Sequence, residues 1–396
     1  MLARAICCGA LFAATTACTF VDCPASAECS GTSDGTGGAG LSPGAGGAGH
    51  LPTAGTGSSS SGSGSSASGL PPGKWVNVTG SLQGMKSGCG NLDTLFARPD
   101  SDVLIAGVYL AGLWASTDGD TDWAALGTGK GSASISNGPL SLVFDPLDPD
   151  RFWEAGIYGD DAGVYETKDG GKTFAAVGDL FHTDSVSLDF SDEQRKTLLA
   201  GGHEAAQTLW KTTDGGATWK SVGRDLPADR WCTIALILDA ENYLVGCGQS
   251  GGLTGIFRSS DAGGHWTKVS DGGGSGRPLL ASDGSIYWTT ASNGQLLRSV
   301  DLGLTWVEMM PADVLPGKSP IELPDGRIAA LGPQTVVVSA DHGETWDYAS
   351  GGLPYTDAAG LLYSSFQRAF FIWHNDCQDA VLDDAVMRFD FDYETQ

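Results

Sequence analysis

Short apolar runs separated by turns rich in Gly and Asp fill the chain from residue 74 onward. In one stretch the apolar runs 233–238 and 243–245 flank a polar turn, and the run 255–257 follows. Runs of this length are typical of β-strands, since helices need about ten residues or more. A similar arrangement recurs along the chain. The pattern therefore predicts a series of small antiparallel sheets with two strands before each repeated turn and two around it.

An eight-residue segment recurs at the third strand of these units. Full copies begin at residues 167, 212, 259, 299 and 339, and a degenerate copy begins at residue 116. Each full copy holds Ser or Thr, then Asp, then Gly, and ends in an aromatic residue. The starting positions are 51, 45, 47, 40 and 40 residues apart, a period typical of a propeller or a solenoid. The repeated acidic residues are Asp118, Asp169, Asp214, Asp261, Asp301 and Asp341.

These copies resemble the Asp-box, or BNR repeat, of sialidases, xyloglucan-specific hydrolases, sortilin-type receptors and photosystem assembly factors. The resemblance covers about residues 74–396 and implies a β-propeller, but no single function. The N-terminal residues considered below add the expectation of a bacterial lipoprotein. In each copy we expect the Asp to accept hydrogen bonds from turn amides and the Gly to supply a left-handed backbone. These residues are therefore interpreted as structural rather than catalytic.

The number of blades follows from the ends of the repeat region. Six units carry the segment, and a seventh, at 360–391, has only three apolar runs. The missing strand is expected at 74–78, which resembles the strand after a repeat. The sequence thus predicts an all-β, seven-bladed propeller of four-stranded antiparallel blades, with the N-terminal strand closing the last blade. Closure of this kind removes exposed sheet edges.

The first 73 residues predict export and a tether. A basic residue and the apolar run 5–14 indicate a signal peptide over residues 1–17. Small residues before Cys18 resemble a lipobox, in which that Cys becomes lipidated; ordinary secretory cleavage is the alternative. Of the 44 residues in 30–73, 15 are Gly and 11 are Ser, so 18–73 is predicted to be a lipidated Cys with a disordered linker. The expected location is the cell envelope, as an outer-membrane or surface lipoprotein, or else the exterior.

Cysteine positions indicate disulfides, as expected of an exported chain. Cys232 and Cys247 flank one hairpin and are predicted to pair. Cys89 and Cys377 are candidates for a clamp across the closure, and Cys23 and Cys29 for a small loop near the lipid. Six cysteines allow 15 connectivities, so these pairings are hypotheses.

The charge balance limits the partners. With 22 Lys and Arg against 47 Asp and Glu, the net charge is -25, which opposes binding to nucleic acid. We expect a monomer that contacts a membrane only through its lipid. No motif predicts a metal site or a cofactor. The partner is expected to be a glycan or a protein.

Ligands of propellers usually bind over the central channel, on the face opposite the repeat hairpins. The turns between second and third strands and the loops between blades form this loop face. Candidate ligand-binding residues there are Tyr109, Tyr158, His182, His203, Arg230, Trp231, Arg277, Tyr355 and His374. Candidate catalytic acids are Asp161, Asp184 and Glu204.

Two functions remain open at this point. A binding or scaffold propeller needs only the loop face. A divergent glycoside hydrolase needs two carboxyl groups about 5–10 Å apart. Sialidases also carry an Arg-Ile-Pro segment, which this chain lacks, and xyloglucan hydrolases carry an Asp where this chain has Tyr109. The sequence therefore favours the binding function, with a sialidase- or xyloglucanase-like hydrolase as the alternative.

Overall fold

The computed structural model describes residues 73–87, 92–117, 121–133, 135–248, 255–290, 295–309, 314–315, 317–374, 381–383 and 385–395. The predicted signal peptide and linker, Asp118, and the cysteines at 18, 23, 29, 89 and 377 lie outside these residues. No helix in the described part of the chain has both the length and the apolar character needed to cross a bilayer.

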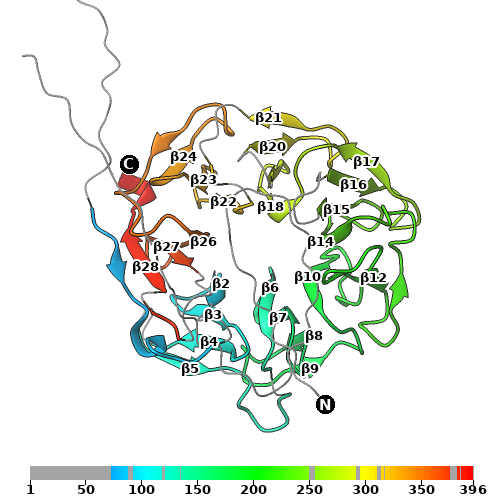
Figure 1. The fold of residues 1–396 in the computed structure, drawn as a ribbon, viewed down its shortest axis with the longest axis horizontal. Helices are drawn as coiled ribbons and strands as arrows, with labels where there is room; N and C mark the ends of the chain where they lie inside the picture. The colour runs from blue at the N-terminus through cyan, green and yellow to red at the C-terminus, as the bar shows by residue number, and fades with distance from the viewer. Residues whose placement is uncertain are drawn as a thin grey trace, which may run out of the picture. The chain divides into compact units, whose positions relative to one another are not determined.

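Seven four-stranded sheets surround a common centre (Figure 1), and each is an antiparallel meander. Blade 1 contains β2 (Leu92–Ala97), β3 (Leu104–Val108), β4 (Gly112–Ser116) and β5 (Trp123–Ala125). Blade 2 contains β6 (Gly138–Asp145), β7 (Asp148–Ile157), β8 (Gly163–Thr167) and β9 (Ala175–Ala176). Blade 3 contains β10 (Thr183–Leu188), β11 (Leu198–Gly202), β12 (Leu209–Thr212) and β13 (Lys220–Ser221). Blade 4 contains β14 (Trp231–Ile237), β15 (Tyr243–Gly248), β16 (Gly255–Ser259) and β17 (Thr267–Ser270).

The remaining blades follow the same order. Blade 5 contains β18 (Ser275–Leu280), β19 (Ile286–Thr289), β20 (Leu296–Ser299) and β21 (Val307–Met309). Blade 6 contains β22 (Ile321–Glu322), β23 (Ile328–Leu331), β24 (Val336–Ser339) and β25 (Asp347–Tyr348). Blade 7 contains β26 (Ala358–Ser364), β27 (Ala369–His374), β28 (Val386–Asp390) and β1 (Val76–Asn77), and short 3-10 turns lie at Gly80–Leu82 and Tyr393–Thr395. The predicted seven-bladed, all-β propeller is confirmed.

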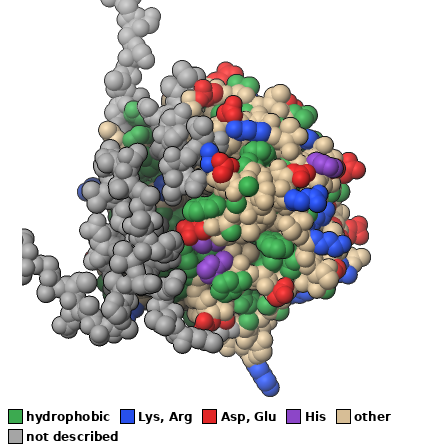
Figure 2. All heavy atoms as spheres, turned by 45° about the vertical axis from the view of Figure 1, so that its right-hand side comes forward, with side chains coloured by type: hydrophobic (Ala, Val, Ile, Leu, Met, Phe, Trp, Pro, Cys, Tyr) green, Lys and Arg blue, Asp and Glu red, His purple; other side chains and the backbone are tan. Residues whose placement is uncertain are grey.

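Burial explains why the apolar runs differ along each blade. Every residue of the second strands β3 and β11 is buried, because neighbouring blades cover both faces of the sheet there. The outermost strands β13 and β25 have only exposed residues. On the side of the molecule shown in Figure 2, acidic and basic side chains are interspersed among polar ones. The interior of the ring is therefore built from the central strands, and the outermost strands face solvent.

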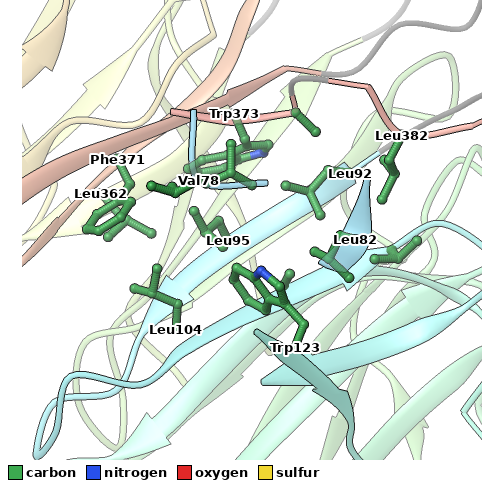
Figure 3. Packing of buried hydrophobic residues seen from close by; sticks show 14 of the residues in the cluster. Val78, Leu82, Leu92, Leu95, Leu104, Trp123, Leu362, Phe371, Trp373 and Leu382 are labelled. Carbon is green, nitrogen blue, oxygen red and sulfur yellow. The ribbon is translucent and has the colours of Figure 1, made fainter. Parts of the chain in front are cut away.

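The N-terminal strand closes the ring as predicted. Val76 and Asn77 pair with Arg388 and Met387 of β28. Beyond the strand, the Val78 amide donates to the Val386 carbonyl at 2.9 Å, and the Val386 amide donates to Thr79 Oγ1 at 3.0 Å. Figure 3 shows the packing at this seam, where side chains of the first and last blades share one apolar cluster. Both ends of the propeller domain thus belong to the same sheet region.

The repeat hairpins show why the Asp recurs. Asp169 Oδ1 accepts from the Thr173 amide at 2.9 Å, and Asp169 Oδ2 accepts from Thr173 Oγ1 at 2.6 Å. Thr167 Oγ1 in turn accepts from the Gly171 amide at 2.9 Å. The copies at Asp214, Asp261, Asp301 and Asp341 form matching bonds. All five carboxyl groups are occupied by their own turns, in agreement with a structural role.

Cys232 and Cys247 form the predicted disulfide between paired positions of β14 and β15. Both residues are 1% exposed. The bond closes a loop with a sequence separation of 15, which corresponds to about 3 kcal/mol of stabilisation through the unfolded state.

We expect a variant with Cys232→Ala and Cys247→Ala to lose about 3 kcal/mol of free energy of unfolding. Urea denaturation measures this loss. Reductant should lower the stability of the native protein by a similar amount and leave the double variant unchanged. Equal stability of the native protein with and without reductant would contradict the assignment of this stabilisation to the bond.

Candidate functional site

The inner strands of six blades are irregular near their first residues. Their pairing with the second strand shifts register there, so extra residues face a single partner position, as in β-bulges. Bulges bend a strand and redirect a side chain, and they are frequent next to binding sites. The out-of-register residues include Asp93, Leu140, Asp184, Thr233, Arg277 and Ala359, and all six line one cavity.

This cavity has a volume of about 900 Å³ and follows the centre of the ring, where Figure 1 shows the inner strands β2, β6, β10, β14, β18, β22 and β26. Its wall also contains His203, Glu204 and Trp231. A central cavity with aromatic and polar groups in its wall is the expected place for a ligand.

A hydrogen-bonded chain of three side chains lies at the loop face of this cavity. His203 Nδ1 lies 2.6 Å from Asp184 Oδ1, and His203 Nε2 lies 2.8 Å from Tyr158 Oη. Since an ionised carboxylate only accepts, Nδ1 carries a proton and donates to Asp184. Glu204 Oε2 approaches Nε2 of the same ring at 3.7 Å. Asp184 and Glu204 therefore flank one imidazole rather than an open space.

Aromatic rings extend this chain across the first three blades. The ring centroid of Tyr158 lies 6.0 Å from Tyr109, 5.1 Å from His182 and 5.1 Å from His203. Phe181 stacks on His182 at 4.3 Å and is 62% exposed. We call Tyr109, Tyr158, Phe181, His182 and His203 the aromatic–imidazole cluster. The structure thus brings together four predicted ligand-binding residues and adds Phe181.

The backbone of this cluster is strained. Tyr158, His182 and Glu204 have φ values of 54°, 55° and 48°, in the left-handed region. Bulky residues rarely adopt this conformation, which costs on the order of 1–3 kcal/mol at each position. Three such residues within one contact network indicate that the orientation of their side chains is maintained against this strain.

The two histidines of the cluster have opposite proton affinities. Burial by itself lowers the pKa of His203, but the hydrogen bond that His203 donates to Asp184 and the charges of Asp184 and Glu204 outweigh it and raise that pKa. Burial, followed by the charge of His203, lowers the pKa of His182. Relative to a free imidazole, the site therefore stabilises the charged form of His203 and the neutral form of His182.

The third candidate acid, Asp161, belongs to a neighbouring network. Asp161 Oδ2 accepts from Ser136 Oγ at 2.8 Å, and its backbone carbonyl accepts from Asn137 Nδ2 at 3.2 Å. The same Asn137 Nδ2 donates to the carboxyl group of Glu154 at 3.1 Å. Asp161 is thus held by its own partners and is not paired with Asp184 or Glu204.

Two buried acids were missed by the sequence reasoning. Burial raises the pKa of Glu154 to about 8, although the bond from Asn137 opposes this shift. Burial also raises the pKa of Asp93 to about 8, and its Oδ2 atom has no partner among the described residues. A readable signal existed, because each is the only acid within an apolar run of its strand. Asp93 adds a neutral carboxylic acid to the cavity wall.

The remaining predicted ligand-binding residues divide into three places. Trp231 and Arg277 line the central cavity. Arg230 forms an ion pair with Asp229 at 3.1 Å. Tyr355 and His374 form a separate pair with ring centroids 4.5 Å apart, and burial raises the pKa of Tyr355. Tyr355 lies just before β26 and His374 is the last residue of β27. This pair therefore belongs to blade 7 and not to the aromatic–imidazole cluster.

The arrangement offers rings and hydrogen bonds more than it offers a hydrolytic acid pair. A glycosidase needs two carboxyl groups facing a bond between them, and the His203 ring occupies the space between Asp184 and Glu204. No group of three or more His, Cys, Asp or Glu side chains in the described ranges is arranged to hold a metal ion.

Comparisons with known proteins agree on the fold and differ in function. No family model matches the chain. The chain is 26% identical over 276 residues to a xyloglucanase from Paenibacillus sp., covering 58% of this chain and 25% of that protein. It is 24% identical over 288 residues to the photosystem II assembly lipoprotein Ycf48 of Synechococcus sp. (strain CC9902), covering 68% of this chain and 79% of that protein.

Solved structures give the same picture. The GH74 enzyme of Niastella koreensis superposes with a TM-score of 0.55 at 15% identity, covering 79% of this chain and 44% of that one. This chain therefore spans about a quarter of the xyloglucanase and less than half of the GH74 enzyme. The class defined by fold and site is a seven-bladed β-propeller with distant relatives among both xyloglucanases and a photosystem assembly factor.

Proposed function

We propose that the protein is a membrane-tethered Asp-box propeller that binds a glycan on its loop face. The observation that carries this proposal is the aromatic–imidazole cluster beside a cavity of about 900 Å³ that is also lined by Trp231. Aromatic side chains offer flat apolar faces to sugar rings, while hydroxyl and imidazole groups exchange hydrogen bonds with sugar hydroxyls. The bonds within the repeat hairpins support membership of the Asp-box superfamily.

A binding function is favoured over hydrolysis by the environment of the acids. Asp184 and Glu204 flank His203, and Asp161 is bonded to Ser136. In addition, Tyr109 occupies the position where the sequence resemblance to xyloglucan hydrolases would require an Asp. The relative named xyloglucanase supports a glycan as the ligand class, although this chain matches only 25% of its length.

The cellular context is part of the proposal. The predicted signal peptide, the lipobox-like Cys18 and the Gly- and Ser-rich linker support a location in the cell envelope as a lipoprotein. The name of the Ycf48 relative, an assembly lipoprotein, supports lipid attachment. The same name, which gives photosystem II assembly as the role of that relative, makes a protein or peptide the competing ligand class.

The binding proposal is tested with the chain lacking residues 1–72 on a glycan array, followed by calorimetry on each hit. We expect Trp231→Ala and His203→Ala to weaken binding at least tenfold, because both side chains line the cavity. Phe366→Ala and His342→Ala serve as matched controls, since these exposed residues lie on the opposite, hairpin face. Each hit is also incubated with the protein and examined for new reducing ends.

Three outcomes would count against this function. Release of reducing ends would favour the hydrolase alternative. If Trp231→Ala leaves the affinity unchanged, the ligand does not bind in the central cavity. An array without hits, together with binding of peptides, would favour the protein-ligand alternative.

A further inference from the structure

Arg277 is an exception among the arginines of this acidic chain. Nine of the eleven arginines in the described ranges have a carboxylate oxygen within 4.0 Å. They are Arg98, Arg151, Arg195, Arg224, Arg230, Arg298, Arg327, Arg368 and Arg388. Arg258 has no such ion pair but feels the charge of Asp239. Arg277 lies in the central cavity, and no acid contributes to its pKa, which burial lowers to about 10.

Backbone oxygens hold this guanidinium in place. Arg277 Nη2 donates to the Leu140 carbonyl at 2.6 Å, and Nη1 donates to the Leu142 carbonyl at 3.2 Å. The guanidinium carbon lies 4.8 Å from the centre of the Phe96 ring. Arg277 belongs to blade 5, Leu140 and Leu142 to blade 2, and Phe96 to blade 1. The side chain therefore reaches across the ring, and two carbonyl dipoles and an aromatic ring, rather than a carboxylate of the described residues, offset its charge.

The guanidinium retains unused donors. Of its five N–H groups, the two bonds to carbonyl oxygens use two, and Nε has no partner among the described residues. Nε is not one of the fully buried polar atoms without a partner, so it is not sealed inside the protein. Since Arg277 lines the cavity, this N–H group faces space that a ligand can enter.

The local backbone is shaped to present Arg277. Residues 276–278 stand opposite the single position Trp288, which is the largest irregularity among the inner strands. Gly276 has a φ of 64°, and a Cβ atom at this position would collide with the Gly317 carbonyl. The Arg277 amide donates to Ser319 Oγ at 2.7 Å, and the Gly276 carbonyl accepts from Trp288 Nε1 at 3.0 Å.

Three acids of the cavity wall have partners other than Arg277, and Glu204 Oε2 lies 3.7 Å from His203 Nε2. Asp184 is bonded to His203, and Glu322 accepts from the amide and hydroxyl groups of Ser282. Asp93 is protonated at neutral pH, so it can donate to a ligand oxygen. A buried cation without a carboxylate partner, as Arg277 is among the described residues, is unfavourable, and an incoming anion would relieve this penalty. A guanidinium can bind either a carboxylate or a phosphate. A carboxylate with one negative charge is repelled less by Asp184 and Glu204, which line the same cavity, than a phosphate with two.

We infer that Arg277 forms a carboxylate subsite, and that the glycan bound by this propeller carries a uronic acid. This inference rests on the proposed glycan-binding function and names the ligand class for the same cavity. The carboxylate reaches the guanidinium from the loop face, while the neutral part of the glycan contacts Trp231 and the aromatic–imidazole cluster.

The first experiment compares matched pairs of oligosaccharides that differ only in a C6 carboxylate or a C6 hydroxymethyl group. We expect the acidic member to bind the chain lacking residues 1–72 at least tenfold more tightly. Arg277→Met should remove this preference, whereas Arg277→Lys should retain part of it. Trp231→Ala should weaken both members. Thermal melting verifies that each variant is folded.

The second experiment observes the guanidinium directly. In the ¹⁵N-labelled protein, sodium glucuronate should shift the Arg277 Nε–H resonance, assigned by its loss in Arg277→Lys, and glucose should not. Tighter or equal binding of neutral members, with the Nε–H signal unmoved, would overturn this inference and leave glycan binding intact. If no oligosaccharide of either kind binds, the proposed function fails as well. If an acetylated dipeptide shifts the Arg277 Nε–H resonance and glucuronate does not, the inference of a uronic acid ligand is wrong and a peptide carboxylate is favoured.

Discussion

The free energy of unfolding of the native protein is expected to fall as the pH rises, and replacing Glu154 with Gln should make this fall smaller. Glu154 is fully buried in β7, and burial raises its pKa from 4.5 to about 8. The folded protein therefore retains a proton that the unfolded chain releases near pH 4.5. Stability from this group is complete below pH 4.5 and is lost progressively up to about pH 8.

The contribution of Glu154 to the free energy of unfolding changes by about 5 kcal/mol over this interval. Chemical denaturation at pH 4.5, 6, 7.5 and 9 measures it. Glu154→Gln should equal or slightly fall below the native protein at pH 4.5 and exceed it at pH 9, since Gln keeps the shape without the ionisation. Asp93→Asn should act in the same direction, because burial raises the pKa of Asp93 as well.

Glu344→Gln is the matched control, since Glu344 is exposed in a repeat hairpin. Below pH 4.5, the free energy of unfolding should depend on pH in the same way for all variants. Hydrogen bonds from Thr218 and Thr345 hold the pKa values of Asp214 and Asp341 near 2, so the stability that these turns supply above pH 4 falls toward pH 2. Parallel curves for Glu154→Gln and the native protein between pH 4.5 and 9 would show that Glu154 is not buried as a neutral acid.

Removing the closing strand is expected to lower the melting temperature by at least about 10 °C. The comparison is between a chain lacking residues 1–72 and one lacking residues 1–79. The shorter chain loses the pairing of Val76 and Asn77 with β28, and the packing of Trp75 on Phe389, whose ring centroids are 5.3 Å apart. It also exposes the edge of β28, which favours aggregation.

A point variant tests the same seam with less disturbance. Thr79→Val keeps the side-chain shape but removes the acceptor of the Val386 amide, so it should cost about 1–3 kcal/mol. Val76→Thr, at a position that is 56% exposed, should change stability by less than about 0.5 kcal/mol. If both truncated chains melt at the same temperature, the N-terminal strand does not close the ring in solution.

Much of the fold was readable because its signals are local. The repeated Asp, Gly and aromatic residues determine each hairpin through bonds within eight residues, as Asp169 and Thr173 show. The missing strand of the last blade was identified from the likeness of 74–78 to strands after a repeat, and β1 lies where this likeness placed it. The pairing of Cys232 with Cys247 likewise followed from a single hairpin.

The site was readable only in part. The rule that ligands lie on the loop face grouped Tyr158, His182 and His203 correctly, since their positions depend on the order of strands. Asp93 and Arg277 owe their places to bulges, and a bulge depends on how two strands pair. The sequence could therefore nominate Arg277 but could not indicate that it reaches blades 1 and 2.

The sequence by itself determined the number of blades, the hairpins and the closing strand, because each depends on short-range bonds or on a repeated pattern. Only the tertiary structure decided which side chains face the central cavity and in which state of charge. Burial raises the pKa of Asp93 and Glu154 and lowers the pKa of Arg277, and burial arises only when residues far apart in the chain surround the same space.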